Sequence, residues 1–217
     1  MKYGIEAKKY VVVNYRHLTL IQAISLAALG FAIYQSYFLS LSVYIGIGVL
    51  VVLTALYAIP VLPHTKNLRS LGGLKIFVVA LVWAGSTVVL PVLAADVSIS
   101  WDVQMETVQR FLLVLILLVP FEIRDLAYDS PELHTLPQRF GVKGTKIIAA
   151  CAIAPFFLLT LLKDAAHPAE LWVNAVLCLL LGVLILSTRI SRNRYFASFW
   201  VEAVPILWWA LLFLSES

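Results

Sequence analysis

The chain has 217 residues, of which 62% are hydrophobic and 13% are charged, and its mean hydropathy is +0.94. A soluble domain of this size could not cover so much apolar surface, so the composition excludes an ordinary water-soluble protein and is typical of an integral membrane protein. The net charge of +4 does not indicate nucleic-acid binding, because the basic residues lie in short loops beside apolar stretches, where membrane topology explains them.

Seven apolar stretches follow one another along the chain, and each is long enough, or nearly so, to cross about 30 Å of hydrocarbon as a helix. A spanning helix satisfies its own backbone hydrogen bonds, which an isolated strand cannot do. The sequence therefore predicts an all-α, polytopic transmembrane helix bundle of about seven spans, with residues 1–217 as a single transmembrane domain. The predicted spans are about 18–39, 41–63, 74–95, 108–126, 145–163, 171–188 and 198–214.

The basic residues alternate with these spans. Fourteen of the 16 Lys and Arg residues lie in the N-terminal segment or in the loops after the second, fourth and sixth spans, and only Arg110 and Lys163 lie on the opposite side. By the positive-inside rule, the basic side is cytoplasmic. We therefore expect an integral membrane protein of the bacterial inner membrane, with its N-terminus in the cytoplasm.

An acidic segment, PFEIRDLAYDSPELHTLPQRFG, covers residues 120 to 141 at the cytoplasmic end of the fourth span. Glu122, Asp125 and Asp129 are three and then four residues apart, which places them within about 60° of one another on a helix. Ionisable residues at membrane depth cost about 2.5–3.5 kcal/mol each, and for that reason they are usually functional.

Two interpretations of this segment stay open from the spacing alone. The acids can be a solvated interface, with Glu122 paired to Arg124 or to a neighbouring loop. Alternatively they can bind Mg²⁺, which takes oxygen ligands and is commonly held by one or two carboxylates together with substrate phosphates. A basic rim would then meet a pyrophosphate whose apolar tail lies between the helices, and the cation and this rim would stabilise the leaving group. The rim residues are Lys66, Arg69, Arg139, Lys143 and Lys146.

The residues themselves resemble a known family. The string EIRDLAYDSPELHTLPQRFG is similar to the second aspartate-rich motif of the UbiA superfamily of intramembrane prenyltransferases, D-x-x-D-x-x-x-D followed by T-L-P-x-x-x-G. Glu122, Asp125 and Asp129 match the acidic positions, with Glu in place of the first Asp. Thr135, Leu136, Pro137 and Gly141 match the tail. A second match is LYAIPVLPHTKNLRSLGGLK, residues 56 to 75, which resembles the family's loop of a tyrosine and proline before a basic stretch.

The resemblance implies a Mg²⁺-dependent enzyme that transfers a prenyl group from a polyprenyl pyrophosphate to an aromatic or other lipophilic acceptor. It implies that Asp125 and Asp129, together with Glu122, hold the metal and that the two aspartates are the catalytic residues. Lys66 and Arg69 would meet the phosphates, joined by Arg139 and Lys143 of the basic rim, and Tyr57 would line the pocket. The implied partners are the prenyl pyrophosphate, its acceptor and membrane lipid, with no nucleic acid.

The chain departs from the family pattern at its N-terminus. The family has nine spans and a first motif, N-D-x-x-D-x-x-x-D, whereas MKYGIEAKKYVVVNYRH contains Glu6 as its only acid. Two explanations stay open: two helices and the first motif precede this sequence in a longer protein, or the chain is a divergent branch whose first motif has decayed. The alternative function is therefore a catalytically inactive or transport-type membrane protein that keeps the bundle and a cation-binding acidic stripe.

Overall fold

The computed structural model describes residues 15–58, 74–129, 131–165, 167–189 and 196–216. These residues form helices and short connections, and no strand occurs among them. The all-α expectation is therefore confirmed for the described chain. The chain divides into two compact units, residues 1–41 and residues 42–217, which are described separately.

The first unit contains one described helix, α2, which runs over Tyr15–Ser36. Its side chains from Leu18 to Gln35 are exposed, and most of them are apolar. An exposed apolar helix of this length suits hydrocarbon rather than water as its solvent.

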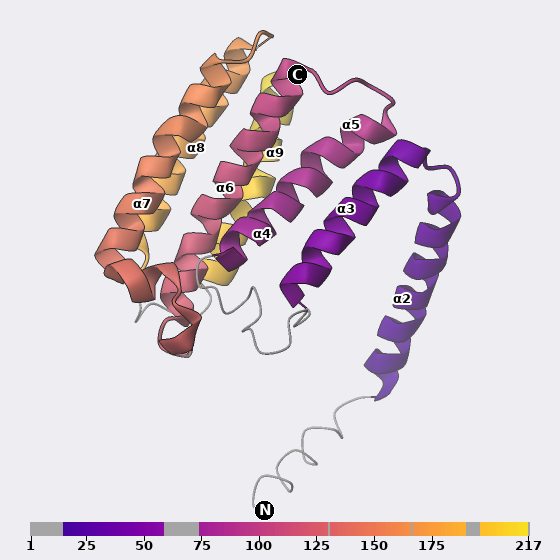
Figure 1. Ribbon diagram of the computed structural model, residues 1–217, viewed down its shortest axis with the longest axis horizontal. Helices are drawn as coiled ribbons and strands as arrows, with labels where there is room; N and C mark the ends of the chain where they lie inside the picture. Colours follow the sequence, from indigo (N-terminus) through magenta and orange to yellow (C-terminus); the bar gives the residue numbers. More distant parts are fainter. Residues whose placement is uncertain (1–14, 59–73, 130, 166, 190–195, 217) are drawn as a thin grey trace, which may run out of the picture. The chain divides into compact units, whose positions relative to one another are not determined.

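The second unit contains the remaining helices (Figure 1). Helix α4 passes through a π turn, η2, into α5, so that the three elements form one continuous helical segment. The second unit contains α3 (Leu41–Ala58), α4 (Leu74–Ala84), η2 (Gly85–Val89), α5 (Leu90–Ala94), α6 (Trp101–Asp125), η3 (Pro131–Leu133), α7 (Leu136–Leu161), α8 (Pro168–Ser187), η4 (Phe196–Val201) and α9 (Glu202–Glu216).

Within the described ranges, four helical segments are long and apolar enough to cross a membrane, and they are Leu18–Ser36, Lys75–Ala94, Leu136–Leu161 and Pro168–Ser187. Leu41–Tyr57 and Phe199–Ser215 are shorter apolar helices. Helix α6 differs because charged residues bound its apolar centre, Glu106 and Arg110 before it and Glu122 and Arg124 after it. Each of the seven predicted apolar stretches thus overlaps a described helix, although residues 59–63 of the second stretch lie outside the described residues, and the four long segments agree with a membrane protein.

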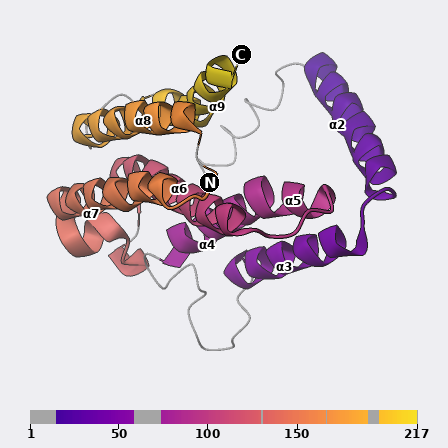
Figure 2. The ribbon, with the colours of Figure 1, turned by 90° about the horizontal axis from the view of Figure 1, so that it is seen from above.

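Helix α6 lies at the centre of the packing in the second unit. It packs against α4 and α7, α7 packs against α8, and α8 packs against α9. Figure 2 shows α8 and α9 on one side of the layer that contains α6 and α7. The side chains buried by this arrangement lie along α6 at helical spacing, at Gln109, Leu113, Ile116, Val119 and Ile123.

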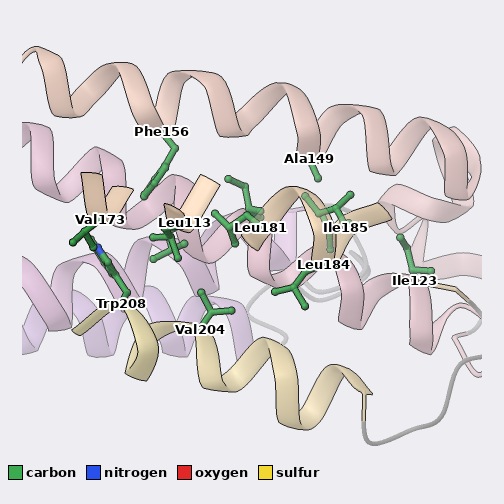
Figure 3. Close-up of a cluster of buried hydrophobic side chains, with 13 residues drawn as sticks. Leu113, Ile123, Ala149, Phe156, Val173, Leu181, Leu184, Ile185, Val204 and Trp208 are labelled. Carbon is green, nitrogen blue, oxygen red and sulfur yellow. The ribbon is translucent and has the colours of Figure 1, made fainter. Parts of the chain in front are cut away.

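The hydrophobic core extends along the length of these helices. Figure 3 shows Ile123 at one end of the core cluster and Trp208, from α9, near the other end. Phe156 of α7 and Leu181 of α8 are among the fully buried side chains between the helices. The buried stripe of α6 carries a polar residue toward each of its ends, Gln109 and Glu122, and each of these residues belongs to a separate polar site.

Candidate functional site

The first polar site lies where α6 ends, and its most buried member is Glu122. This side chain belongs to a residue that is only 5% exposed. Its carboxylate lies 3.6 Å from the ammonium group of Lys75, at the start of α4. A buried carboxylate needs such a partner because an unpaired charge is costly away from water. Glu122 is therefore paired with Lys75 of α4. The interface interpretation names Arg124 or a neighbouring loop as its partner, and the partner is not Arg124.

Arg124 instead binds its neighbour Asp125. The Nε atom of Arg124 donates to Oδ1 of Asp125 at 2.7 Å, and Nη2 donates to Oδ2 at 3.0 Å. The guanidinium also lies 5.0 Å from the centre of the Phe121 ring. Both oxygens of the Asp125 carboxylate thus have a charged donor, in the bidentate arrangement that arginine favours.

Asp129 follows one turn later. The backbone N–H groups of Tyr128 and Asp129 donate to the carbonyl of Asp125 at 2.8 and 2.9 Å, so the chain continues a helical path beyond the last residue of α6. This turn places Asp129, which is half-buried, one turn beyond Asp125. The predicted acidic stripe is therefore present in the backbone geometry as Glu122, Asp125 and Asp129 at successive turns.

Carboxylates are suitable ligands for Mg²⁺, but their arrangement here is not a complete metal cage. Within the described part of the chain, no three His, Cys, Asp or Glu side chains converge to hold a metal ion. Mg²⁺ usually completes its coordination with waters and phosphate oxygens and needs only one or two carboxylates from the protein. Asp125 and Asp129 lie at successive turns and could supply such ligands once Arg124 releases the Asp125 carboxylate.

The T-L-P-x-x-x-G tail shapes the start of α7. Thr135 is the N-cap residue, and its N–H donates to Oε1 of Gln138 at 3.0 Å. Pro137 occupies the first turn, where a missing N–H costs nothing. Gly141 has a φ of +67°, which interrupts the helix, and the hydroxyl of Thr145 donates to the Gly141 carbonyl at 2.8 Å. These residues thus have a structural role at the start and the kink of α7, at the C-terminal end of the acidic segment.

The other predicted site residues are placed less closely. Tyr57 lies in the last turn of α3 and is half-buried. Arg139 and Lys143 are exposed in the first turns of α7, and no ion pair among the described residues joins them to the three acids. Lys66 and Arg69 lie outside the described residues.

A second polar site, which the sequence did not predict, lies at the opposite end of α6. Lys163, in the connection between α7 and α8, donates to Oε2 of Glu106 at 2.6 Å and also to Oε1 of Glu170. Arg110 donates to the other oxygen of Glu106 at 3.0 Å. Burial lowers the pKa of Lys163, but the charges and hydrogen bonds of Glu106 and Glu170 outweigh it, so that this pKa lies above its ordinary value of 10.5.

The ionic cluster continues into a buried hydrogen-bond network. The Arg110 guanidinium lies 4.2 Å from the centre of the Trp208 ring, and Nε1 of Trp208 donates to Oδ1 of Asn174 at 3.0 Å. Asn174 and Gln109 both donate to the hydroxyl of Thr160, at 3.0 and 2.7 Å. Gln109, Thr160 and Asn174 are fully buried, so the network connects α6, α7, α8 and α9 away from solvent.

One sequence signal could have found this second site. Gln109 and Arg110 lie three and four residues after Glu106 at the start of an apolar helix, and polar residues on one face of such a helix usually face the bundle interior. Arg110 and Lys163 are also the two basic residues that break the charge alternation. Both of them bind Glu106.

No protein-family model matches the chain, and no curated protein and no solved structure is significantly similar to it.

Proposed function

We propose that this chain is a membrane-embedded prenyltransferase of the UbiA type, with its pyrophosphate site where α6 ends. The observation that carries the proposal is the acidic path itself. Glu122 is buried, and Asp125 and Asp129 follow it at successive turns, ahead of η3 and the kinked start of α7. The matching sequence motif adds to this support, and the apolar helices around it provide an environment for a prenyl tail.

Asp129 is the member of the acidic stripe that has no ion-pair partner among the described residues. Glu122 is paired with Lys75 and Asp125 with Arg124, so the Asp129 carboxylate is available to a cation. A bound Mg²⁺ would supply charge neutralisation for the phosphates, and Asp125 and Asp129 are the residues that would hold it. Arg124 would exchange its bond to Asp125 for bonds to a pyrophosphate oxygen, because guanidinium groups bind both anions in the same bidentate way.

In this reaction the bond between the prenyl C1 and the pyrophosphate oxygen breaks, and the departing pyrophosphate keeps the electron pair. A carbon of the lipophilic acceptor attacks C1, and the alkylated acceptor then loses a proton to water or to the released pyrophosphate. Lys75 and Arg124 stabilise the negative charge that accumulates on the leaving group. This electrostatic stabilisation lowers the barrier to its departure. The proposed location is the bacterial inner membrane, with this end of the bundle on the cytoplasmic side.

The proposal is tested with membranes that contain the full chain and a radiolabelled prenyl pyrophosphate. We expect pyrophosphate release that requires Mg²⁺ and that Asp125→Asn abolishes. Asp96→Asn, in the connection between α5 and α6, is the matched control and should retain full activity. Equal release by wild type and Asp125→Asn would remove this site from the mechanism.

A second candidate function is a non-catalytic or transport-type bundle that binds a cation without prenyl transfer. The pairing of both Asp125 oxygens with Arg124 favours the absence of prenyl transfer, because this arginine occupies the carboxylate that would hold the catalytic metal and leaves Asp129 for cation binding. This alternative predicts Mg²⁺ binding to the purified chain, weakened by Asp129→Asn, with no pyrophosphate release under any condition.

A further inference from the structure

The connection between α7 and α8 borders a cavity of about 230 Å³ at the end of the bundle opposite Glu122. This volume is smaller than the roughly 300–1,000 Å³ of ordinary small-molecule pockets, so it suits a group of headgroup size. Polar side chains from α6, α8, α9 and the connection line it, together with the apolar Leu212. The polar and aromatic lining residues are Glu106, Lys163, His167, Glu170, Trp208 and Ser215.

The charged groups around this cavity balance one another, but some of their hydrogen-bonding atoms have no partner among the described residues. Glu106 and Glu170 are balanced by Lys163 and Arg110, so the site has no formal net charge that would select a simple anion or a simple cation. Lys163 has three N–H donors and uses two of them for the carboxylates. Glu170 uses one carboxylate oxygen, and its second oxygen accepts no hydrogen bond from the described residues. The cavity therefore offers one charged donor and one charged acceptor.

His167 adds a second donor. Its Nδ1 accepts the backbone N–H of Ala169 at 3.3 Å as the N-cap of α8, which fixes the proton of the neutral imidazole on Nε2. His167 is exposed, so this N–H remains available to a ligand at the mouth of the cavity. An ammonium donor and an imidazole donor suit phosphate oxygens, while the free oxygen of Glu170 suits an ammonium group.

The surroundings of the cavity are those of a membrane interface. Trp101 and Trp172, at the first turns of α6 and α8, are 48% and 76% exposed, and exposed tryptophans concentrate at the headgroup level of a bilayer. Trp209, Phe213 and Leu214 of α9 are also exposed, and they extend an apolar surface along the helix that lines the cavity. A phospholipid could place its chains on this surface and its headgroup in the cavity.

We propose that this cavity binds a phosphoethanolamine group, with its ammonium at Glu170 and its phosphate at Lys163 and His167. Either a phospholipid headgroup or a soluble phosphoethanolamine ester carries this chemistry. Choline headgroups would bind more weakly because their trimethylammonium has no N–H to donate to Glu170. Glycerol headgroups lack the positive charge. The proposal is independent of the prenyl-transfer function, and Asp125→Asn should leave it unchanged.

The test measures binding to the purified full chain in detergent, by native mass spectrometry and by the shift in Tm. The probes are phosphatidylethanolamine, phosphatidylcholine, phosphatidylglycerol and soluble O-phosphoethanolamine. We expect phosphatidylethanolamine to bind at least tenfold more tightly than the other two lipids and to raise Tm. Glu170→Gln should reduce that affinity at least tenfold, while Asp96→Asn, an exposed acid away from the cavity, should not.

A second variant keeps the test decisive if Glu170→Gln fails to fold. Leu212→Trp fills the cavity without removing a charge, and it should abolish the preference for ethanolamine headgroups while the ion pairs of Lys163 persist. Binding of O-phosphoethanolamine without the lipid would support the same ligand chemistry and assign it to a soluble molecule. Equal binding of the three lipids, or an unchanged preference in both variants, would overturn the proposal and leave the cluster with a structural role alone.

Discussion

Lys163 and Glu106 are separated by 57 positions in the sequence, yet their ammonium and carboxylate groups meet at 2.6 Å. The same ammonium group binds Glu170 of α8, so a single side chain in a connecting segment joins the start of α6 to the start of α8. Because the Lys163 side chain is only 8% exposed, this contact is shielded from solvent much more than a surface ion pair.

Replacing the cation of this cluster should destabilise the bundle. Lys163→Met leaves Glu106 with Arg110 alone and leaves Glu170 without a charged partner, and we expect a loss of about 2 kcal/mol because partly buried carboxylates then lack compensation. This loss of stability is measured from the fraction of protein that unfolds in mixed micelles as the SDS content increases. Lys143→Met, an exposed lysine on α7, is the control and should stay within about 0.5 kcal/mol of wild type. Equal stability of the two variants would mean that the cluster contributes nothing.

The same cluster predicts how stability depends on pH. The pKa of Lys163 is higher in the folded protein than its ordinary value of 10.5, so the folded state holds this proton more tightly than the unfolded state. The stabilisation is therefore complete below pH 10.5 and is lost as the pH rises through the folded pKa. We expect the Tm of wild type to fall toward that of Lys163→Met above this pH. Parallel Tm curves for the two proteins across that range would contradict the prediction.

The buried network should show measurable coupling between two of its members. Asn174→Ala and Trp208→Phe each remove one side of the hydrogen bond between Oδ1 and Nε1, so a double-mutant cycle isolates their interaction. Hydrogen bonds between membrane helices average about 0.6 kcal/mol and reach about 1.7 kcal/mol. We expect a coupling energy in that range from SDS unfolding. Strict additivity of the two substitutions would show that the bond does not stabilise the fold.

A glycine pair tests the kink of α7. Gly141 has a φ of +67°, and Gly141→Ala should cost about 1–2 kcal/mol because an L-residue with a Cβ is strained in this conformation, although the space around it is open. Gly182 lies inside α8 and is likewise surrounded by open space, so Gly182→Ala should be neutral or stabilising by up to about 1 kcal/mol. The two variants are compared by Tm. Equal effects would indicate that α7 adapts its backbone at no cost.

The sequence predicted the helices well because their signal is local. Long apolar stretches need only their own composition to be recognised, and each of the seven stretches overlaps a described helix. The predicted helix boundaries were wrong where polar residues belong to the first turns of a helix. Helix α6 begins at Trp101 and not near 108, because Ser100 caps it and polar side chains occupy its first turns. Helix α7 begins at Leu136 and not near 145, because its polar, kinked first turns have no apolar signal.

The partners of the charged residues were not predictable in the same way. The spacing of Glu122, Asp125 and Asp129 indicated one helical stripe, and the backbone bonds from Tyr128 and Asp129 to Asp125 agree with it. The sequence offered a neighbouring loop as one alternative partner of Glu122 but did not single out Lys75, since that contact depends on how α4 packs against α6. The cluster around Lys163 depends in the same way on the packing of distant segments.

The π turn at Gly85–Val89 has a consequence for insertions and deletions in this protein. A π turn accommodates one residue more than an α-helical turn does, so it behaves as a single-residue insertion absorbed within a helix. Removing one residue from this turn should therefore regularise the helix while Lys75 and Ala94 each keep their orientation. Removing one residue from α8, which has no such turn, would rotate the residues of α8 that follow the deletion by about 100°. Their buried side chains would then no longer face the core.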